Sequence, residues 1–297
     1  KSEIDSILDT CEKNKLNTIF FQVRPSCDAL YDSDIFPVSG SISTEGKLVF
    51  DPLEYIVREA HQRNIFIHAW VNPLRVTMNT HDISSLDDKS PAKLHPDWTV
   101  AYDDGKLYLN AGMPEVRELV ADGVREIVSK YDVDGIVFDD YFYPYKVSDK
   151  DADGKSYVVD FPDTLSWEKY GKPFFKDKDA WRRNNVNQLI KSLSETIRST
   201  KPWVKFGISP FGVWRNKSTD PVRGSDSQAG VQNYDDLYAD IILWSEKGWI
   251  DYVTPQLYWK IGRKIVDYPI LLDWWIKYSF GRHLYVGHSM GNGADEI

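Results

Sequence analysis

Two adjacent acidic residues at the end of an apolar segment are the part of this chain best suited to chemistry. Asp139 and Asp140 directly follow the apolar residues 135–138. A charged group at the end of a buried strand costs free energy, so its presence there indicates a function. Aromatic rings come next, at Tyr141, Phe142, Tyr143 and Tyr145. Carboxyl groups that move protons, beside flat rings that cover apolar sugar faces, are what the cleavage of a glycosidic bond requires.

The adjacency of the two acids restricts the mechanism that they can support. A direct glycosidase places two carboxyl groups on opposite sides of the scissile bond, roughly 5 Å or 6.5–9.5 Å apart, whereas neighbours on one strand point to opposite faces. An N-acetylated substrate can instead supply its own acetamide as the nucleophile. We therefore expect Asp140 to be the general acid/base and Asp139 to orient the acetamide, with the reverse assignment open. Asp28, Asp34 and Asp103, in loops, stay open as a second acid.

Polar and aromatic side chains also follow the other apolar segments. Alternation along a strand predicts that Gln22 and Arg24 share one face, as do His68, Trp70 and Asn72. Rings in polar loops are expected to line a cleft, because loops lie on the surface. We expect substrate binding from Gln22, Arg24, Asp28, His68, Trp70, Asn72, Arg75, Tyr141, Tyr143, Ser209, Trp214, Gln256, Tyr258 and Trp259.

Helical and extended segments alternate along the chain. Apolar residues at helical spacing, such as Ile4, Ile7 and Leu8, predict amphipathic helices, and Asp51-Pro52 marks a helix start. We expect helices over residues 2–14, 186–197, 237–244 and 269–279, and two further helices that begin at residues 52 and 114. The expected strands are 18–23, 65–71, 135–138, 204–209, 252–256 and 284–287. Strands that are apolar almost throughout are typical of parallel sheets buried on both faces, so the pattern predicts an α/β fold.

The connections before the strands are short, and those after the strands are long. The long ones are 24–50, 72–113, 140–179 and 210–233. Long connections usually carry function, and in a (β/α)₈ barrel the active site lies at the C-terminal ends of the strands. No G-x-G-x-x-G follows any strand, which argues against a dinucleotide site. We predict a TIM-like (β/α)₈ barrel that forms one domain over residues 1–297.

Six strands are visible in the sequence pattern, two fewer than such a barrel needs. The chain begins in a helix and stops just after a strand. An open barrel would expose strand edges, which is unfavourable. We therefore expect the first and last strands to be missing from this sequence, as in a fragment truncated at both ends.

The composition and net charge argue against several classes of binding partner. The net charge of −9 argues against a nucleic acid or an anionic membrane surface. No run approaches the roughly 20 apolar residues of a membrane span. The two cysteines, Cys11 and Cys27, have neither metal-site spacing nor a disulfide framework. We expect no cofactor and no metal, a carbohydrate polymer as the partner, and leave protein partners unknown.

Five ordered motifs resemble those of the glycosyl-hydrolase-like family 10. They are NTIFFQVRPSCDALY (17–31), HAWVNPLR (68–75), VDGIVFDDYFYPY (133–145), ISPFGVW (208–214) and DYVTPQLYW (251–259). The resemblance implies a TIM-barrel group that includes envelope lipoproteins and a bacterial member acting on peptidoglycan strands stripped of their peptides. The segment VDGIVFDDY is also similar to the DG-x-D-x-D-x-E strand of chitinase-like barrels, although Tyr141 stands where their final Glu would be.

The resemblance implies a glycosidase for N-acetylated bacterial cell-wall glycans. It also implies a place in the cell envelope outside the cytoplasm, with a lipid anchor in the full-length protein. Stripped peptidoglycan carries lactyl carboxylates, and Arg24, Arg75, Arg215 and Lys260, just beyond strand ends, are expected to pair with them.

Other interpretations stay open. The chain could be a glycan-binding barrel without catalysis, in which the acids are structural. It could be a metal-dependent hydrolase or deacetylase that uses His68, Asp139, Asp140 and His288, although no H-x-H or H-E-x-x-H pattern is present. His68 could also be a core histidine.

Overall fold

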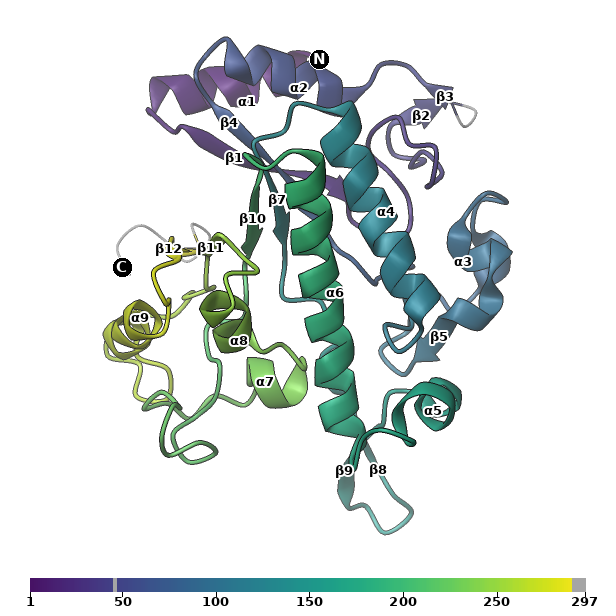
Figure 1. Cartoon of the computed structure of the whole chain (residues 1–297), viewed down its shortest axis with the longest axis vertical. Coiled ribbons are helices and arrows are strands. Elements are labelled where there is room, and N and C mark those ends of the chain that lie inside the picture. Colours follow the sequence, from purple (N-terminus) through teal and green to yellow (C-terminus); the bar gives the residue numbers. More distant parts are fainter. Residues whose placement is uncertain (45–46, 290–297) are drawn as a thin grey trace.

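A computed structural model describes residues 1–44 and 47–289 of the chain. At its centre lies a six-stranded parallel sheet whose strands follow one another in chain order (Figure 1). The strands are β1 (Thr18–Arg24), β4 (Phe66–Val71), β7 (Gly135–Phe138), β10 (Lys205–Ile208), β11 (Tyr252–Val253) and β12 (His283–Leu284). Sequential parallel strands are the order of a (β/α) barrel, whereas doubly wound sheets reverse their order.

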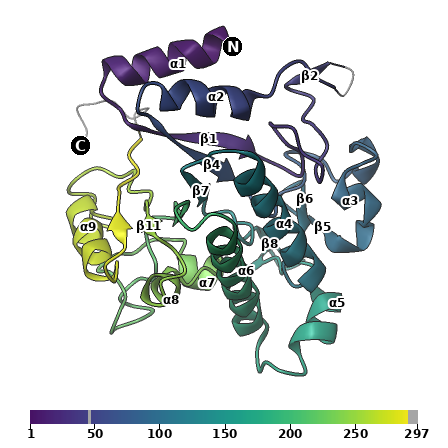
Figure 2. The same ribbon diagram turned by 45° about the horizontal axis from the view of Figure 1, so that its top comes forward.

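One helix precedes the first strand, and others connect the successive strands. They are α1 (Ser2–Lys13), α2 (Pro52–His61), α4 (Pro114–Lys130), α6 (Lys178–Thr200), α7 (Asn233–Asp236), α8 (Ile241–Glu246) and α9 (Tyr268–Lys277). Figures 1 and 2 show α1 beside α2 and α4 beside α6. The start of α2 is as expected, because the Asp51 carboxylate accepts the N–H groups of Leu53 and Glu54 at 2.9 and 3.1 Å.

The predicted α/β fold with parallel strands is confirmed, and the predicted strands differ only at their ends. The strand expected at 252–256 stops at Val253, and the last strand is His283–Leu284 rather than 284–287. Gln256 and Gly287 continue the pairing as an isolated parallel bridge. Within the described residues, β1 and β12 are the two edges of the sheet and do not pair with each other.

Aromatic side chains from β4 and β11 meet on one face of the sheet, which we call the inner face. Nδ1 of His68 lies 2.6 Å from the Tyr252 hydroxyl, and the His68 ring stacks on Phe20 at 5.5 Å between centroids. Two glycines make room for this contact. A Cβ on Gly135 would lie 2.5 Å from His68, and a Cβ on Gly207 would lie 2.0 Å from the Tyr252 ring.

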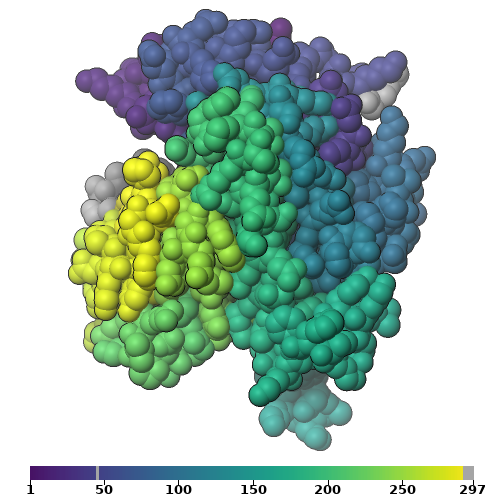
Figure 3. All heavy atoms as spheres, in the orientation of Figure 1, coloured from purple at the N-terminus to yellow at the C-terminus, as the bar shows by residue number. Residues whose placement is uncertain are grey.

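The long connections after the strands carry short elements of their own. They are β2 (Ser43–Thr44), β3 (Lys47–Leu48), η1 (Ile83–Ser85), α3 (Pro91–Leu94), η2 (Pro96–Trp98), β5 (Thr99–Tyr102), β6 (Lys106–Leu109), β8 (Ser148–Lys150), β9 (Ser156–Val158), α5 (Thr164–Ser166) and the π-helical η3 (Trp167–Gly171). In Figure 3 the connections after β4 and β7, blue to teal, lie on the right and below, and the green to yellow C-terminal part lies on the left.

Candidate active site

The acid pair lies at the C-terminal end of β7, a strand whose residues are buried on both faces. Asp140 is buried at 2% exposure, whereas Asp139 is half-buried. The backbone N–H of Asp140 donates to Oδ1 of Asp139 at 2.8 Å. Neither carboxylate forms an ion pair with any residue that the structure describes, so the two acids do not act as a salt-bridge clamp for the scaffold.

Burial and charge together change the acidity of Asp140. Burial raises the pKa of Asp140 to about 7, and the neighbouring negative charge of Asp139 adds to this rise. The hydroxyl of Tyr145 donates to Oδ2 of Asp140 and opposes the rise, because it stabilises the ionised form. A carboxyl group with a pKa near neutrality can hold a proton at physiological pH and release it during a reaction.

Gln256 fixes the orientation of Asp139. Its Nε2 donates to Oδ1 of Asp139 at 2.7 Å and to the backbone oxygen of Ser209 at 3.0 Å. The Ser209 hydroxyl in turn donates to the backbone oxygen of Thr254 at 3.1 Å. These bonds connect the ends of β7, β10 and β11, so Gln256 and Ser209, expected to contact substrate, hold the acid site together.

Four aromatic rings form a continuous row beside the acids. Tyr141 contacts Tyr145 at 6.4 Å between ring centroids, Tyr145 contacts Phe211 at 6.4 Å, and Phe211 contacts Trp259 at 5.5 Å. These rings come from the connections after β7, β10 and β11. Tyr258 is 45% exposed, and burial followed by the charges of the acid pair raises its pKa. Its hydroxyl therefore lies near the acids.

Arg75 brings a positive charge to the same site. It lies four residues after the end of β4, and its guanidinium carbon is 5.1 Å from the centroid of the Tyr141 ring. Burial, followed by the charges of Asp139 and Asp140, raises the pKa of the Tyr141 hydroxyl, and Arg75 opposes that rise. The acid pair and the guanidinium are therefore both near Tyr141.

Gln22, His68 and Trp70 lie on the inner face of the sheet. Gln22 pairs in register with Trp70, which pairs with Val137, two residues before Asp139. Burial lowers the pKa of His68 to about 4, and its ring is bonded to Tyr252. His68 is thus a neutral imidazole that packs on the inner face of the sheet.

Arg24 does not share a face with Gln22, contrary to the prediction. A β-bulge separates them, since Gln22 stands opposite Trp70 while Arg24 stands opposite Val71. Arg24 is 2% exposed, and a Cβ on Gly123 of α4 would lie 2.9 Å from its Nη1. Burial lowers the pKa of Arg24. The guanidinium is therefore a core group beneath α4 rather than a member of the acid site.

Asp28 and Asn72 lie near Arg24. The charge of Asp28 acts on Arg24, although the structure shows no ion pair between them. Asn72 is buried, and its Oδ1 accepts the backbone N–H of Arg75 at 3.3 Å. Oδ1 of Asp28 and Nδ2 of Asn72 find no hydrogen-bond partner among the residues described.

Tyr143 and Trp214 are core residues, which corrects the expectation that they line a cleft. Tyr143 is 2% exposed and packs edge-on against Phe161 and Tyr238. Trp214 is 3% exposed and stacks on Trp274 at 6.0 Å. Their loops fold back onto the helices, so both rings are covered by neighbouring side chains.

Tyr145 and Phe211 lie beside the acid pair, although they were not among the residues expected to bind substrate. Tyr145 is the hydrogen-bond donor to Asp140, and Phe211 joins the aromatic row. Their signals were present, because both belong to the motifs at strand ends. Which ring of an aromatic segment turns toward the acid depends on the loop conformation, which periodicity does not predict.

The described residues hold no group of three or more His, Cys, Asp or Glu that could bind a metal ion. His68 is bonded to Tyr252, and His288 is exposed and stacks on Tyr268 at 5.5 Å. The His and Asp residues expected for a metal hydrolase are therefore not gathered in the described part of the chain.

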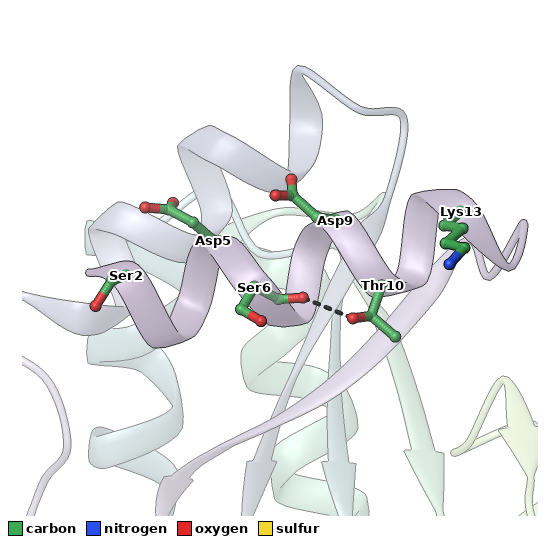
Figure 4. Close-up of a pocket in the computed structure, with 6 residues that line it drawn as sticks. All are labelled: Ser2, Asp5, Ser6, Asp9, Thr10 and Lys13. Carbon is green, nitrogen blue, oxygen red and sulfur yellow. Dashed lines mark hydrogen bonds between the residues drawn. The ribbon is translucent and has the colours of Figure 1, made fainter.

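Surface hollows occur outside the acid site. One of about 380 Å³ runs along α1 and is lined by residues of that helix alone (Figure 4). They are Ser2, Asp5, Ser6, Asp9, Thr10 and Lys13. Another, of about 480 Å³, lies between β5 and η3 and includes Asp97, Leu165 and Tyr170. Neither includes a residue of the acid pair. No helix in the described part of the chain is long and apolar enough to cross a membrane.

Comparisons with known proteins agree on one family. The family model "Glycosyl hydrolase-like 10" matches residues 1–291. Glycosyl hydrolase YngK of Bacillus subtilis (strain 168) is 45% identical over 293 residues, which cover 97% of this chain and 55% of YngK. Glycosyl hydrolase DigH of Escherichia coli (strain K12) is 41% identical over 280 residues, which cover 90% of this chain and 60% of DigH. The chain thus spans less than two thirds of either relative.

A solved structure shares the fold at low sequence identity. Alpha-L-fucosidase isoenzyme 2 from Paenibacillus thiaminolyticus matches with a TM-score of 0.50 and 14% sequence identity. The match covers 99% of this chain and 43% of the fucosidase chain. The likeness concerns the fold alone.

Proposed function

The chain belongs to the glycosyl hydrolase-like 10 family, and from that membership we propose that it is a glycoside hydrolase for N-acetylated bacterial cell-wall glycans. Peptidoglycan strands freed of their peptides are the substrate we favour. The observation that carries the proposal is the acid pair, which is free of ion pairs with described residues and contains one carboxyl group with a pKa raised to about 7. With that substrate, we propose a place outside the cytoplasm, in the cell envelope.

The two acids take different roles because their surroundings differ. Asp140 holds the proton at neutral pH, and its Oδ2 is occupied by the Tyr145 hydroxyl. On binding, the glycosidic oxygen takes the place of that hydroxyl and receives the proton as the bond to the anomeric carbon breaks. Asp139, half-buried and held by Gln256, accepts the acetamide N–H of the sugar.

The acetamide completes the reaction without a third carboxyl group. Its carbonyl oxygen attacks the anomeric carbon and forms a cyclic intermediate, as in substrate-assisted glycosidases. A water molecule then opens the ring and gives its proton to the Asp140 carboxylate, which restores the acid. The row from Tyr141 to Trp259, whose four residues are half-buried, would contact the apolar sides of successive sugars.

Digestion of a panel of purified glycans tests the proposal. Peptide-free peptidoglycan strands and chitin oligosaccharides carry acetamides, whereas cello-oligosaccharides do not. We expect products, identified by mass, from the acetamido glycans and none from the cello-oligosaccharides, with activity unchanged by a chelator. Binding without products would favour a glycan-binding barrel, and loss of activity with the chelator would favour a metal hydrolase.

A further inference from the structure

The guanidinium of Arg75 is held in place by contacts that leave part of it unused. Its Nε and Nη2 donate to the backbone oxygen of Pro25 at 3.1 and 2.9 Å. Its guanidinium carbon lies 5.1 Å from the centroid of the Tyr141 ring, and Arg75 also interacts with the Tyr141 hydroxyl, whose pKa it lowers. The side chain is half-buried, so its position is defined by packing as well as by these bonds.

The donor geometry of Arg75 fits a carboxylate. A guanidinium has five N–H donors in a planar fork. The Pro25 carbonyl uses the edge formed by Nε and Nη2, so the edge formed by Nη1 and Nη2 faces elsewhere. No carboxylate of the described residues pairs with Arg75. An end-on edge, like a side-on one, can bind a carboxylate through two parallel hydrogen bonds.

The two other arginines expected to contact an anion are used elsewhere. Arg24 is buried beneath α4 on the outer face of the sheet. Arg215 donates from Nε and Nη2 to both carboxylate oxygens of Asp235, at 2.7 and 3.0 Å, and its Nη1 reaches Asp220 at 3.3 Å. Arg75 differs from both, because it adjoins the acid pair and has no carboxylate partner among the described residues.

The charges around the site indicate a role for the Arg75 guanidinium in ligand binding. The chain carries a net charge of −9, and the charges of Asp139 and Asp140 act on the same Tyr141 hydroxyl as Arg75 does. An anionic ligand approaching these acids would be repelled unless a cation met it. A guanidinium fixed beside the acids but not paired with them can supply that compensation.

We propose that Arg75 is a specificity-determining residue that binds a carboxylate on the glycan, through its Nη1–Nη2 edge, next to the linkage held by the acid pair. The ligand class is a glycan whose acetamido sugars include one with a carboxylate substituent. The inference rests on the proposed function for the site, and it adds that the protein distinguishes acidic glycans from neutral ones of the same backbone.

The test compares one glycan in two charge states. Peptide-free peptidoglycan strands are used as they are and after their carboxyl groups have been converted to amides. Binding is measured by calorimetry in the Asp140→Asn background, so that turnover does not interfere. We expect the acidic strands to bind about tenfold to a hundredfold more tightly, as a charge-assisted bidentate pair predicts. With Arg75→Gln added, the ratio should fall to about one, and with Arg75→Lys it should be intermediate.

Arg58→Gln is the matched control. Arg58 is exposed on α2 and pairs with Glu59, so its loss should leave the ratio as it is. An equal preference with and without Arg75, or no binding of either glycan, overturns the inference. Turnover by the unsubstituted protein is measured separately. Binding with the expected ratio but without products would overturn the hydrolase proposal alone, and cleavage of both glycans with equal binding would overturn the role of Arg75 alone.

Discussion

The surroundings of Asp140 favour its neutral, protonated form. Burial is the largest cause of its raised pKa, and the charge of Asp139 is the second. The Tyr145 hydroxyl acts in the opposite direction, because a hydrogen bond to a carboxylate stabilises the ionised form. The balance keeps the proton on Asp140 near neutral pH, where a general acid has to hold it.

Replacement of Tyr145 by Phe tests this balance. The proposed mechanism needs protonated Asp140, so kcat/KM should fall as pH rises above about 7, the raised pKa. Removal of the hydroxyl removes a bond that favours the carboxylate, and the falling limb should move upward by about one pH unit. The measurement is a pH–rate profile from pH 5 to 9 for both proteins. A limb at the same pH in both would show that Tyr145 does not act on the catalytic acid.

Asp140 should also lower the stability of the protein above neutral pH. Its pKa is raised from 3.8 to about 7 on folding, so between these values the folded chain binds more protons than the unfolded chain. The free energy of unfolding therefore decreases as pH rises through that window. Asp140→Asn, which never ionises, should be more stable than the parent at pH 8 by about 1–4 kcal/mol, and similar to it at pH 4.

Urea unfolding at the two pH values measures this difference. Asp132→Asn is the control, since its side chain is 72% exposed at the opposite end of β7. A loss of stability in Asp140→Asn that is the same at both pH values would mean that the carboxylate is structural.

At this scale the sequence predicted the acids better than their neighbours. Asp139 and Asp140 could be placed because they directly follow a strand, and Gln256 because it lies just beyond the end of another and continues its pairing as an isolated bridge. Tyr145 and Tyr143 could not be told apart, since both lie in the same aromatic segment. One reaches Asp140 and the other is in the core, and the path of the loop decides which.

The central sheet needs small residues at two positions, as well as apolar residues along its strands. His68 and Tyr252 meet across two strands only because Gly135 and Gly207 carry no side chain between them. The sequence pattern predicted the strands, since continuous apolar runs mark parallel strands. It did not predict the β-bulge that turns Arg24 outward, because a bulge depends on pairing with β4 and not on the composition of β1.

Gly207→Ala tests the role of the inner aromatic contact. The added Cβ would lie 2.0 Å from the Tyr252 ring, so the ring or the strand has to move. We expect a loss of about 1–3 kcal/mol in the free energy of unfolding, as for other overpacked cores. Gly40→Ala, where nothing lies within 4 Å of the new Cβ, is the control. Equal stability of the two variants would show that the contact between His68 and Tyr252 is not tightly packed.

For the whole molecule, the order of the six parallel strands and the position of the acids agree with a barrel whose site lies at the strand ends. Loop lengths predicted that end of the sheet, because the long connections all follow strands. The described residues do not close the barrel, because the edge strands β1 and β12 do not pair with each other.

If the acid pair cleaves N-acetylated glycans, substitution of either aspartate alone must lower turnover. The measurement is kcat/KM for release of sugar products from peptide-free peptidoglycan strands, with products identified by mass. We predict that Asp139→Asn and Asp140→Asn each lose activity by about a hundredfold or more, as removal of acid–base catalysis does, while Asp132→Asn stays close to the parent. Cleavage by both variants at the rate of the parent would contradict the account.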